Sequence, residues 1–181
     1  MTNERDHYED LKVVLKQHIR AKFRPKCSDP TLQVIALMSA PSETIYIETT
    51  ADKHLSNTLK SKIRKGWELI FSFLKSTRPD LTGFVEDQSK IDFMVVEFKN
   101  EPLILDDIYQ LKKYADLFDA KYSLLISTDE IPDELKRLRD VIPDLLSRSV
   151  GHNKLTIVHY DIKQHSFLDW FPEDPFPDNI M

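Results

Sequence analysis

Cysteine and glycine are scarce in this chain. One cysteine, Cys27, and three glycines occur among its 181 residues. A single cysteine cannot form an internal disulfide or a cysteine-rich zinc site, so we expect an intracellular protein without a structural metal held by cysteine. Three scattered glycines cannot build the glycine-rich loop that cradles the phosphate groups of a nucleotide, so that class of binding site is excluded.

Long apolar runs are missing as well. No stretch is apolar over the length needed to cross a bilayer, and the polar start, Met-Thr-Asn-Glu-Arg-Asp, does not resemble a secretory signal. We therefore expect a cytoplasmic protein with no membrane partner. The length suits a single domain over residues 1–181, with a core large enough to fold without covalent or metal cross-links.

Positive charge is in the minority and is unevenly distributed. The formal net charge is −5, with 25 Lys and Arg against 30 Asp and Glu. Residues 1–78 hold 14 of these basic residues against 9 acids, a net charge of +5, whereas residues 79–181 carry a net charge of −10. An acidic average argues against a nucleic-acid partner, but binding depends on the local field, so the basic part of the chain keeps that partner possible.

Hydrophobic periodicity predicts an alternation of helices and strands. Before residue 79 the predicted elements are, in order, helix 4–23, strands 32–38 and 44–50, helix 53–65 and strand 67–75. We interpret residues 1–50 as an N-terminal extension, a helix and a hairpin packed on the core. Both helices carry basic side chains, which form either solvated faces or surfaces that follow a phosphate backbone.

The pattern continues through the rest of the chain. The predicted elements are a hairpin with strands 80–87 and 91–99, helix 105–118, strand 122–127, one or two helices within 131–148, and strand 154–161. An apolar strand that follows a helix is typical of a parallel crossover, so the sequence predicts an α/β fold with a mixed central sheet flanked by helices.

The tail, residues 166–181, differs in composition from the rest. It holds four aromatic residues among three prolines, so no regular structure is expected there. Its aromatic side chains either dock on the protein's own core or bind a protein partner.

The predicted hairpin brings two acids and a lysine together. If its turn is centred between residues 88 and 89, Asp80 lies opposite Glu97, and Lys99 shares a face with Glu97 because side chains alternate along a strand. Such a pattern can be an exposed edge with a salt bridge. The apolar run over residues 94–96 instead indicates a central strand, where two charged side chains on one face suggest a function.

These residues resemble the motif of the PD-(D/E)XK nuclease superfamily. Pro79-Asp80 is similar to the Pro-Asp half of that motif, and Glu97-Phe98-Lys99 is similar to the Glu-x-Lys half. The predicted order helix, strand, strand, strand, helix, strand over residues 53–127 also resembles the superfamily. The resemblance implies a restriction-endonuclease-like core and a metal-dependent nuclease that acts on DNA.

The resemblance also implies roles for the site residues. Asp80 and Glu97 would bind Mg²⁺ or Mn²⁺, with the Phe98 carbonyl as a further oxygen ligand, and Lys99 would be the catalytic lysine. Carboxylates suit these hard cations, which neutralise charge at the phosphate and activate water. Burial or a nearby metal would lower the pKa of Lys99, and the carboxylates would oppose that shift.

Two further sets of residues belong to the predicted site. Gln110 and Tyr114, spaced as Gln-x-x-x-Tyr on the next helix, resemble the RecB-like branch, which implies substrate positioning; alternatively they are an exposed amide beside a half-buried phenol. The residues predicted to contact the DNA backbone are Lys53, Lys60, Lys62, Arg64 and Lys65.

The predicted helix 53–65 contains no acid, although many members of the superfamily carry one on the first core helix. Glu48, Asp52 and Glu68 are alternative sources of that acid, whereas Asp92 lies by parity on the face opposite Glu97. The missing acid leaves two interpretations open: a nuclease, or a catalytically silent binding or scaffolding module that acts through protein partners. A homodimer would suit the cleavage of both DNA strands.

Overall fold

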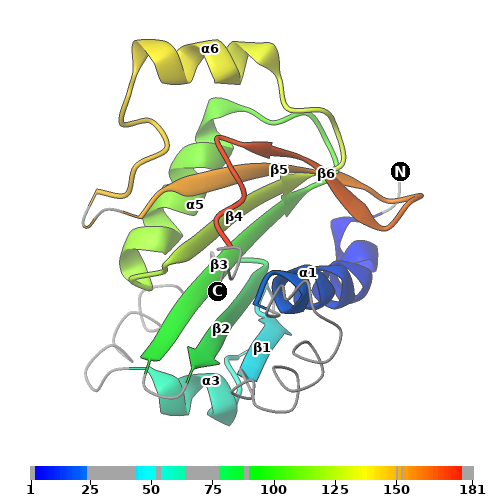
Figure 1. Ribbon diagram of the computed structural model, residues 1–181, viewed down its shortest axis with the longest axis vertical. Coiled ribbons are helices and arrows are strands. Elements are labelled where there is room, and N and C mark those ends of the chain that lie inside the picture. The colour runs from blue at the N-terminus through cyan, green and yellow to red at the C-terminus, as the bar shows by residue number, and fades with distance from the viewer. Residues whose placement is uncertain are drawn as a thin grey trace, which may run out of the picture.

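A six-stranded mixed sheet forms the centre of the protein (Figure 1). The structure is a computed structural model that describes residues 3–23, 44–51, 54–63, 78–87, 90–149, 151 and 153–176. The strands are β1 (Thr44–Thr49), β2 (Leu81–Asp87), β3 (Lys90–Lys99), β4 (Tyr122–Ser127), β5 (Leu155–Asp161) and β6 (Ser166–Phe171). They lie in chain order across the sheet. β1, β2 and β3 are antiparallel, β3, β4 and β5 are parallel, and β6 returns antiparallel to β5. The predicted α/β fold with a mixed central sheet is confirmed.

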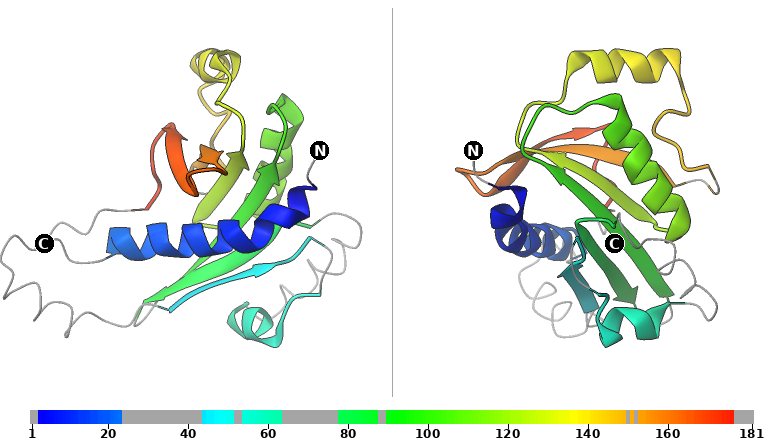
Figure 2. Two further views of the ribbon diagram at one scale, coloured as in Figure 1. Left: turned by 90° about the vertical axis from the view of Figure 1, so that its right-hand side faces the viewer. Right: turned by 180° about the vertical axis from the view of Figure 1, so that it is seen from behind.

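Helices cover both faces of the sheet (Figure 2). One face is covered by α1 (Tyr8–Phe23), which follows a short 3-10 turn, η1 (Glu4–His7). The other face is covered by α5 (Leu105–Leu117) and, at one end, by α3 (Asn57–Lys62). The remaining described helix, α6 (Asp133–Val141), lies at the periphery of the molecule, and Leu135 is its buried residue.

Alternation along β3 explains how one strand serves two cores. Met94, Val96 and Phe98 belong to the apolar cluster beneath α1, whereas Val95 belongs to the cluster beneath α5. Each of these four side chains is fully buried. Because successive side chains point to opposite faces, a central strand must be apolar on both. Glu97, on the α5 face, interrupts that rule.

The predicted register of the hairpin is confirmed. Leu81 pairs with Val96 and Asp87 pairs with Lys90, as a turn between residues 88 and 89 requires. β1 approaches β2 very closely at Gly83, where an added Cβ would lie 2.2 Å from the Tyr46 carbonyl oxygen. Any larger residue at position 83 would force the two strands apart.

Several predicted boundaries need correction or lie outside the described residues. The basic helix predicted over 53–65 is shorter in the structure, because α3 begins after the N-cap Ser56, whose Oγ accepts a hydrogen bond from the Leu59 N–H at 3.1 Å. β1, predicted as part of a hairpin extension, is an edge strand of the central sheet. The strands predicted over 32–38 and 67–75 lie outside the described residues.

The prediction that the tail lacks regular structure is wrong for residues 166–171. They form β6, because the tail prolines all follow Phe171 and leave the preceding N–H groups free to join the ladder. The aromatic residues pack on the protein itself: Phe167 and Trp170 contact the cluster beneath α1, and Phe176 is buried within it. Asp174 fastens this segment to α1 through His18 Nε2, at 2.9 Å, and Lys22 Nζ, at 3.0 Å.

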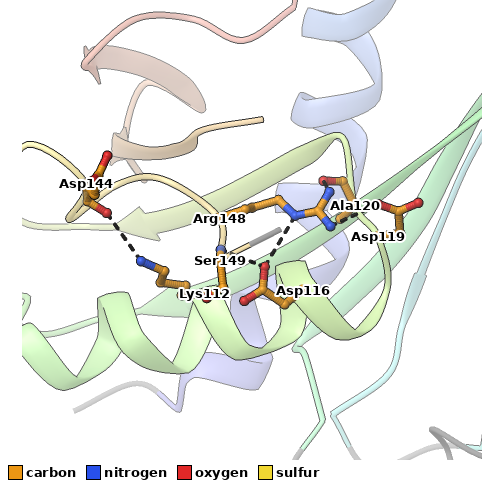
Figure 3. Close-up of polar contacts among 7 residues, drawn as sticks. All are labelled: Lys112, Asp116, Asp119, Ala120, Asp144, Arg148 and Ser149. Atoms are coloured by element: carbon orange, nitrogen blue, oxygen red, sulfur yellow. Dashed lines mark hydrogen bonds and ion pairs between the residues drawn. The ribbon is translucent and has the colours of Figure 1, made fainter. Parts of the chain in front are cut away.

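A buried arginine ties the segment after α6 to the end of α5 (Figure 3). Arg148 is 6% exposed; its Nη1 donates to the Ala120 carbonyl at 3.1 Å and its Nη2 to Asp119 Oδ1 at 2.9 Å. Asp116 completes the contact, since its Oδ1 lies 3.5 Å from Arg148 Nε and accepts the Ser149 N–H at 3.0 Å. One guanidinium therefore holds both the Ala120 carbonyl, three residues after α5 ends, and two carboxylates.

Arg148→Met should destabilise the fold by about 2–3 kcal/mol, because hydrogen bonds between charged groups are lost and a buried carbonyl loses its donor. Arg137→Met, at an exposed position of α6, is the matched control and should change stability by less than about 0.5 kcal/mol. Urea unfolding of both variants measures the difference. Equal stability of the two variants would contradict the structural role of Arg148.

Candidate active site

The predicted site residues meet where β2 begins and β3 ends. Asp80 immediately precedes β2, and Glu97 and Lys99 lie in the last three residues of β3. The Asp80 carboxylate accepts two hydrogen bonds, from the Tyr8 hydroxyl to Oδ1 at 2.6 Å and from the Phe98 N–H to Oδ2 at 2.9 Å. These contacts fix the carboxylate between α1 and the end of β3.

Glu97 is an acid whose side chain is almost completely shielded from solvent. Its residue is 2% exposed, and its Oε1 is buried without a hydrogen bond to any described residue. Burial raises the pKa of Glu97 to about 9, and the neighbouring Asp80 carboxylate acts in the same direction, whereas the Lys99 ammonium opposes the shift. Glu97 therefore requires either a proton or a cation at neutral pH.

Lys99 is surrounded by acids. Its Nζ lies 3.4 Å from Asp107 Oδ1, and its side chain is 17% exposed. Burial lowers the pKa of Lys99, but the carboxylates of Glu97, Asp107 and Glu4 outweigh that effect and raise the pKa above its usual value. Lys99 is therefore a positively charged ammonium ion at neutral pH, suited to donate hydrogen bonds and not to accept a proton.

Three residues of this cluster were not predicted as site residues. Asp107 caps α5, where its Oδ2 accepts the Ile104 N–H at 2.9 Å, and also pairs with Lys99. Tyr8 and Glu4 come from the N-terminal helical segment. Burial and the Asp80 carboxylate raise the pKa of Glu4, and Lys99 opposes the shift, which places its carboxyl group within the same electrostatic cluster. Of these three residues, only Asp107, an acid at the start of the predicted helix 105–118, could be recognised from the local sequence. Tyr8 could not, because more than 70 residues separate it from Asp80.

Gln110 and Tyr114 lie on α5 as predicted but differ in exposure. Gln110 is partly exposed, whereas Tyr114 is completely buried in the apolar cluster beneath α5. Lys113 Nζ lies 4.5 Å from the centroid of the Tyr114 ring. A substrate could reach Gln110 but not Tyr114, so any role of Tyr114 is to support the helix.

Of the three alternative acids the structure describes only Glu48, which does not join the cluster. Glu48 binds the Tyr46 hydroxyl at 2.7 Å and the Ser56 N–H at 2.9 Å, so it supports the start of α3. Asp92 lies near the opposite end of β3, where its Oδ2 is 2.7 Å from Lys121 Nζ. Asp52 and Glu68 lie outside the described residues.

Of the predicted DNA-backbone contacts, the two that the structure describes, Lys60 and Lys62, lie on α3, far from Asp80. Lys62 Nζ lies 2.6 Å from Glu86, which is six residues beyond Asp80 in the chain and therefore about 20 Å away along β2. Lys60 is exposed on the same helix. The other three predicted contacts, Lys53, Arg64 and Lys65, lie outside the described residues.

The donor set suits a hard divalent cation only in part. Asp80 and Glu97 supply two neighbouring carboxylates, and the unpartnered Oε1 of Glu97 fits a ligand atom. Across the described residues, however, no three His, Cys, Asp or Glu side chains form a group arranged to hold a metal ion. The Phe98 N–H is bound to Asp80, and the predicted role of its carbonyl oxygen stays a prediction.

Comparisons with known proteins do not identify the chain. No family model matches it, and no curated protein or solved structure shows significant similarity to it. In the part of the chain that the structure describes, no helix is both long and apolar enough to cross a membrane.

Tyr8→Phe tests whether the phenol orients Asp80. We expect a loss of about 1–2 kcal/mol in stability, because a hydrogen bond to a charged group disappears, and a fall in any cleavage rate of about tenfold. Tyr46→Phe is the matched control. The Tyr46 hydroxyl also donates to an acid, Glu48 at 2.7 Å, but this pair lies beside α3 and away from the candidate site. Stability should fall in both variants and cleavage only in Tyr8→Phe; equal cleavage rates would contradict the role of Tyr8.

Proposed function

We propose that the protein is a divalent-metal-dependent nuclease of the PD-(D/E)XK type that hydrolyses phosphodiester bonds of DNA in the cytoplasm. The observation that carries the proposal is the meeting of Asp80, Glu97 and Lys99 at the end of β3, beside a buried apolar run, Met94–Val96, and the buried Phe98. Isolated charges are rarely buried in a central strand without a partner or a task. The raised pKa of Glu97 is typical of functional sites.

The order of the described elements supports the same proposal, with α3 inserted between β1 and β2. The sequence helix, strand, strand, strand, helix, strand is formed by α1, β1, β2, β3, α5 and β4. The first helix of this series is therefore α1, preceded by η1, and not the basic helix predicted over 53–65. Glu4, in η1, then offers the acid that the helix 53–65 lacks.

The chain's own residues would perform distinct tasks. Asp80 and Glu97 would hold Mg²⁺ or Mn²⁺, which supplies charge neutralisation at the phosphate and an activated water when bound. The Tyr8 hydroxyl and the Phe98 N–H orient the Asp80 carboxylate. Lys99, positively charged and positioned by Asp107, would donate hydrogen bonds to the phosphate oxygen or the attacking water as negative charge develops.

A cleavage assay tests the proposal directly. Purified protein is incubated with single-stranded, double-stranded and nicked DNA in Mg²⁺, in Mn²⁺ and in EDTA, beside the Lys99→Ala variant. Cleavage that requires a divalent ion and Lys99 supports the proposal. Equal cleavage by both proteins would indicate a contaminating enzyme or another site.

A catalytically silent module is the second candidate. It is favoured by the absence of a three-residue metal group among the described residues and by the two hydrogen bonds already made by Asp80. Metal titration followed by thermal unfolding separates the two candidates. A protein that neither binds Mg²⁺ or Mn²⁺ nor cleaves any DNA form would be a silent module, for which a homodimer or another protein partner is then sought.

A further inference from the structure

Three basic residues form a stripe along α1. Lys12, Lys16 and Arg20 are spaced four residues apart, so their side chains lie on one side of the helix, about 6 Å apart along its axis. The stripe flanks the buried residues Leu11, Leu15 and Ile19, and it lies on the side away from His18, which stacks on Trp170. In Figure 2 the helix runs across the face of the sheet. Along this side Lys12 and Lys16 are partly exposed and Arg20 is exposed.

The positive charge of the stripe is largely uncompensated. Among the described residues Lys16 and Arg20 have no ion-pair partner, and Lys12 pairs only with Glu9, at 2.6 Å, whose side chain is 76% exposed. Burial lowers the pKa of Lys16, and the positive charges of Lys12 and Arg20 act in the same direction, against Glu9. Like charges thus stand close enough to repel one another, an arrangement that a polyanion would relieve.

The stripe leads to the candidate active site. Tyr8, whose hydroxyl binds Asp80, lies on the same helix one turn before Lys12. Arg20 is twelve residues beyond Tyr8, about 18 Å along the helix axis. The three cations are therefore spread over a line that begins beside Asp80, Glu97 and Lys99.

This geometry differs from that of the other basic helix. On α3, Lys62 is already paired with Glu86, and it lies at the far end of the hairpin from Asp80. The local charge near the site itself is acidic, through Glu4, Asp80, Glu97 and Asp107. A polyanionic substrate needs attraction from a neighbouring surface, and α1 offers Lys16 and Arg20, which have no ion-pair partner among the described residues, together with Lys12, in continuity with the site.

We infer that Lys12, Lys16 and Arg20 form a track that binds successive phosphates of a DNA strand and directs it toward Asp80. The inference rests on the proposed function for its choice of DNA, but it makes a separate statement about binding. Each cation contacts a backbone phosphate and reads no base, so the track binds DNA irrespective of sequence.

The salt dependence of binding provides the test. Fluorescence anisotropy with labelled single-stranded and double-stranded DNA, in EDTA, measures the dissociation constant of the full chain over a series of NaCl concentrations. The logarithm of the binding constant falls linearly with log[NaCl], by about 0.7 per phosphate contact on single strands and about 0.9 on duplex. The variant K12Q/K16Q/R20Q should therefore make this slope shallower by about 2 on single strands and about 2.7 on duplex. The DNA form whose slope changes by the full amount expected for three contacts is the one that the track follows.

The variant K136Q/R137Q/R139Q is the matched control, because it removes the same charge from α6. Its slope should equal that of the wild type. If the α1 triple variant does not fold, Arg20→Gln, at an exposed position, should still lower the slope by about 0.7–0.9.

The outcomes separate the track from the nuclease proposal. A slope that falls only in the α1 variants supports the track, even if no cleavage is found. An unchanged slope, an equal fall in both triple variants, or no DNA binding by the wild type would overturn it, even if the protein cleaves DNA. Binding to anionic phospholipid vesicles without binding to DNA would also overturn it.

Discussion

Lys99→Ala should lower the rate of DNA cleavage by about 10²–10³-fold, the typical loss when one charged donor is removed from a reacting centre. Lys99 is the one cation of the site cluster formed with Glu4, Asp80, Glu97 and Asp107, as far as the described residues show. Without it, negative charge that develops on the phosphate would face carboxylates alone. The loss should therefore appear in kcat more than in KM.

Two variants control this result. Lys121→Ala removes a lysine that is likewise paired with an aspartate, Asp92 at 2.7 Å, but near the opposite end of β3, and it should leave cleavage unchanged. Lys99→Arg keeps the positive charge and should retain more activity than Lys99→Ala. Circular dichroism confirms that each variant is folded. A Lys99→Ala protein as active as the wild type would remove Lys99 from the mechanism.

Glu97→Gln should make the metal-free protein more stable at neutral and alkaline pH. The pKa of Glu97 is raised to about 9 in the folded protein, so the folded state keeps a proton that the unfolded state releases above about pH 4.5. Wild-type stability should therefore fall as pH rises from about 4.5 to 9, and this part of the fall should be missing from the glutamine variant. At pH 7 we expect a gain of about 3 kcal/mol, or about 6–12 °C in Tm.

Thermal unfolding in EDTA from pH 5 to 9 measures this difference. Glu134→Gln, at an exposed position of α6, is the control and should follow the wild type throughout. Addition of Mg²⁺ or Mn²⁺ should stabilise the wild type, since a cation replaces the proton of Glu97, and should have little effect on Glu97→Gln. If the stability of the wild type and of the glutamine variant depends on pH in the same way, the pKa of Glu97 is not raised by its burial.

Much of the fold could be predicted from local pattern. The hairpin register, strands 44–50, 122–127 and 154–161, and the helix beginning at Leu105 follow from alternation, apolar runs and helical spacing, and the structure has these elements within a few residues. The tail was mispredicted over residues 166–171 because the position of the prolines, and not their number, decides where a strand can form. All described tail prolines follow β6, so six residues before them could join β5.

The hairpin sequence alone determined that Glu97 and Lys99 share a face beside Asp80, because register and parity are local properties of two adjacent strands. Tertiary packing decided the rest of the site. Tyr8 and Glu4 reach it because α1 crosses the sheet with its first turn over the end of β3, and Asp107 because α5 begins beside Lys99. Packing also decided the charge states. Burial among apolar side chains raises the pKa of Glu97, and the spacing of residues in the sequence does not predict that burial.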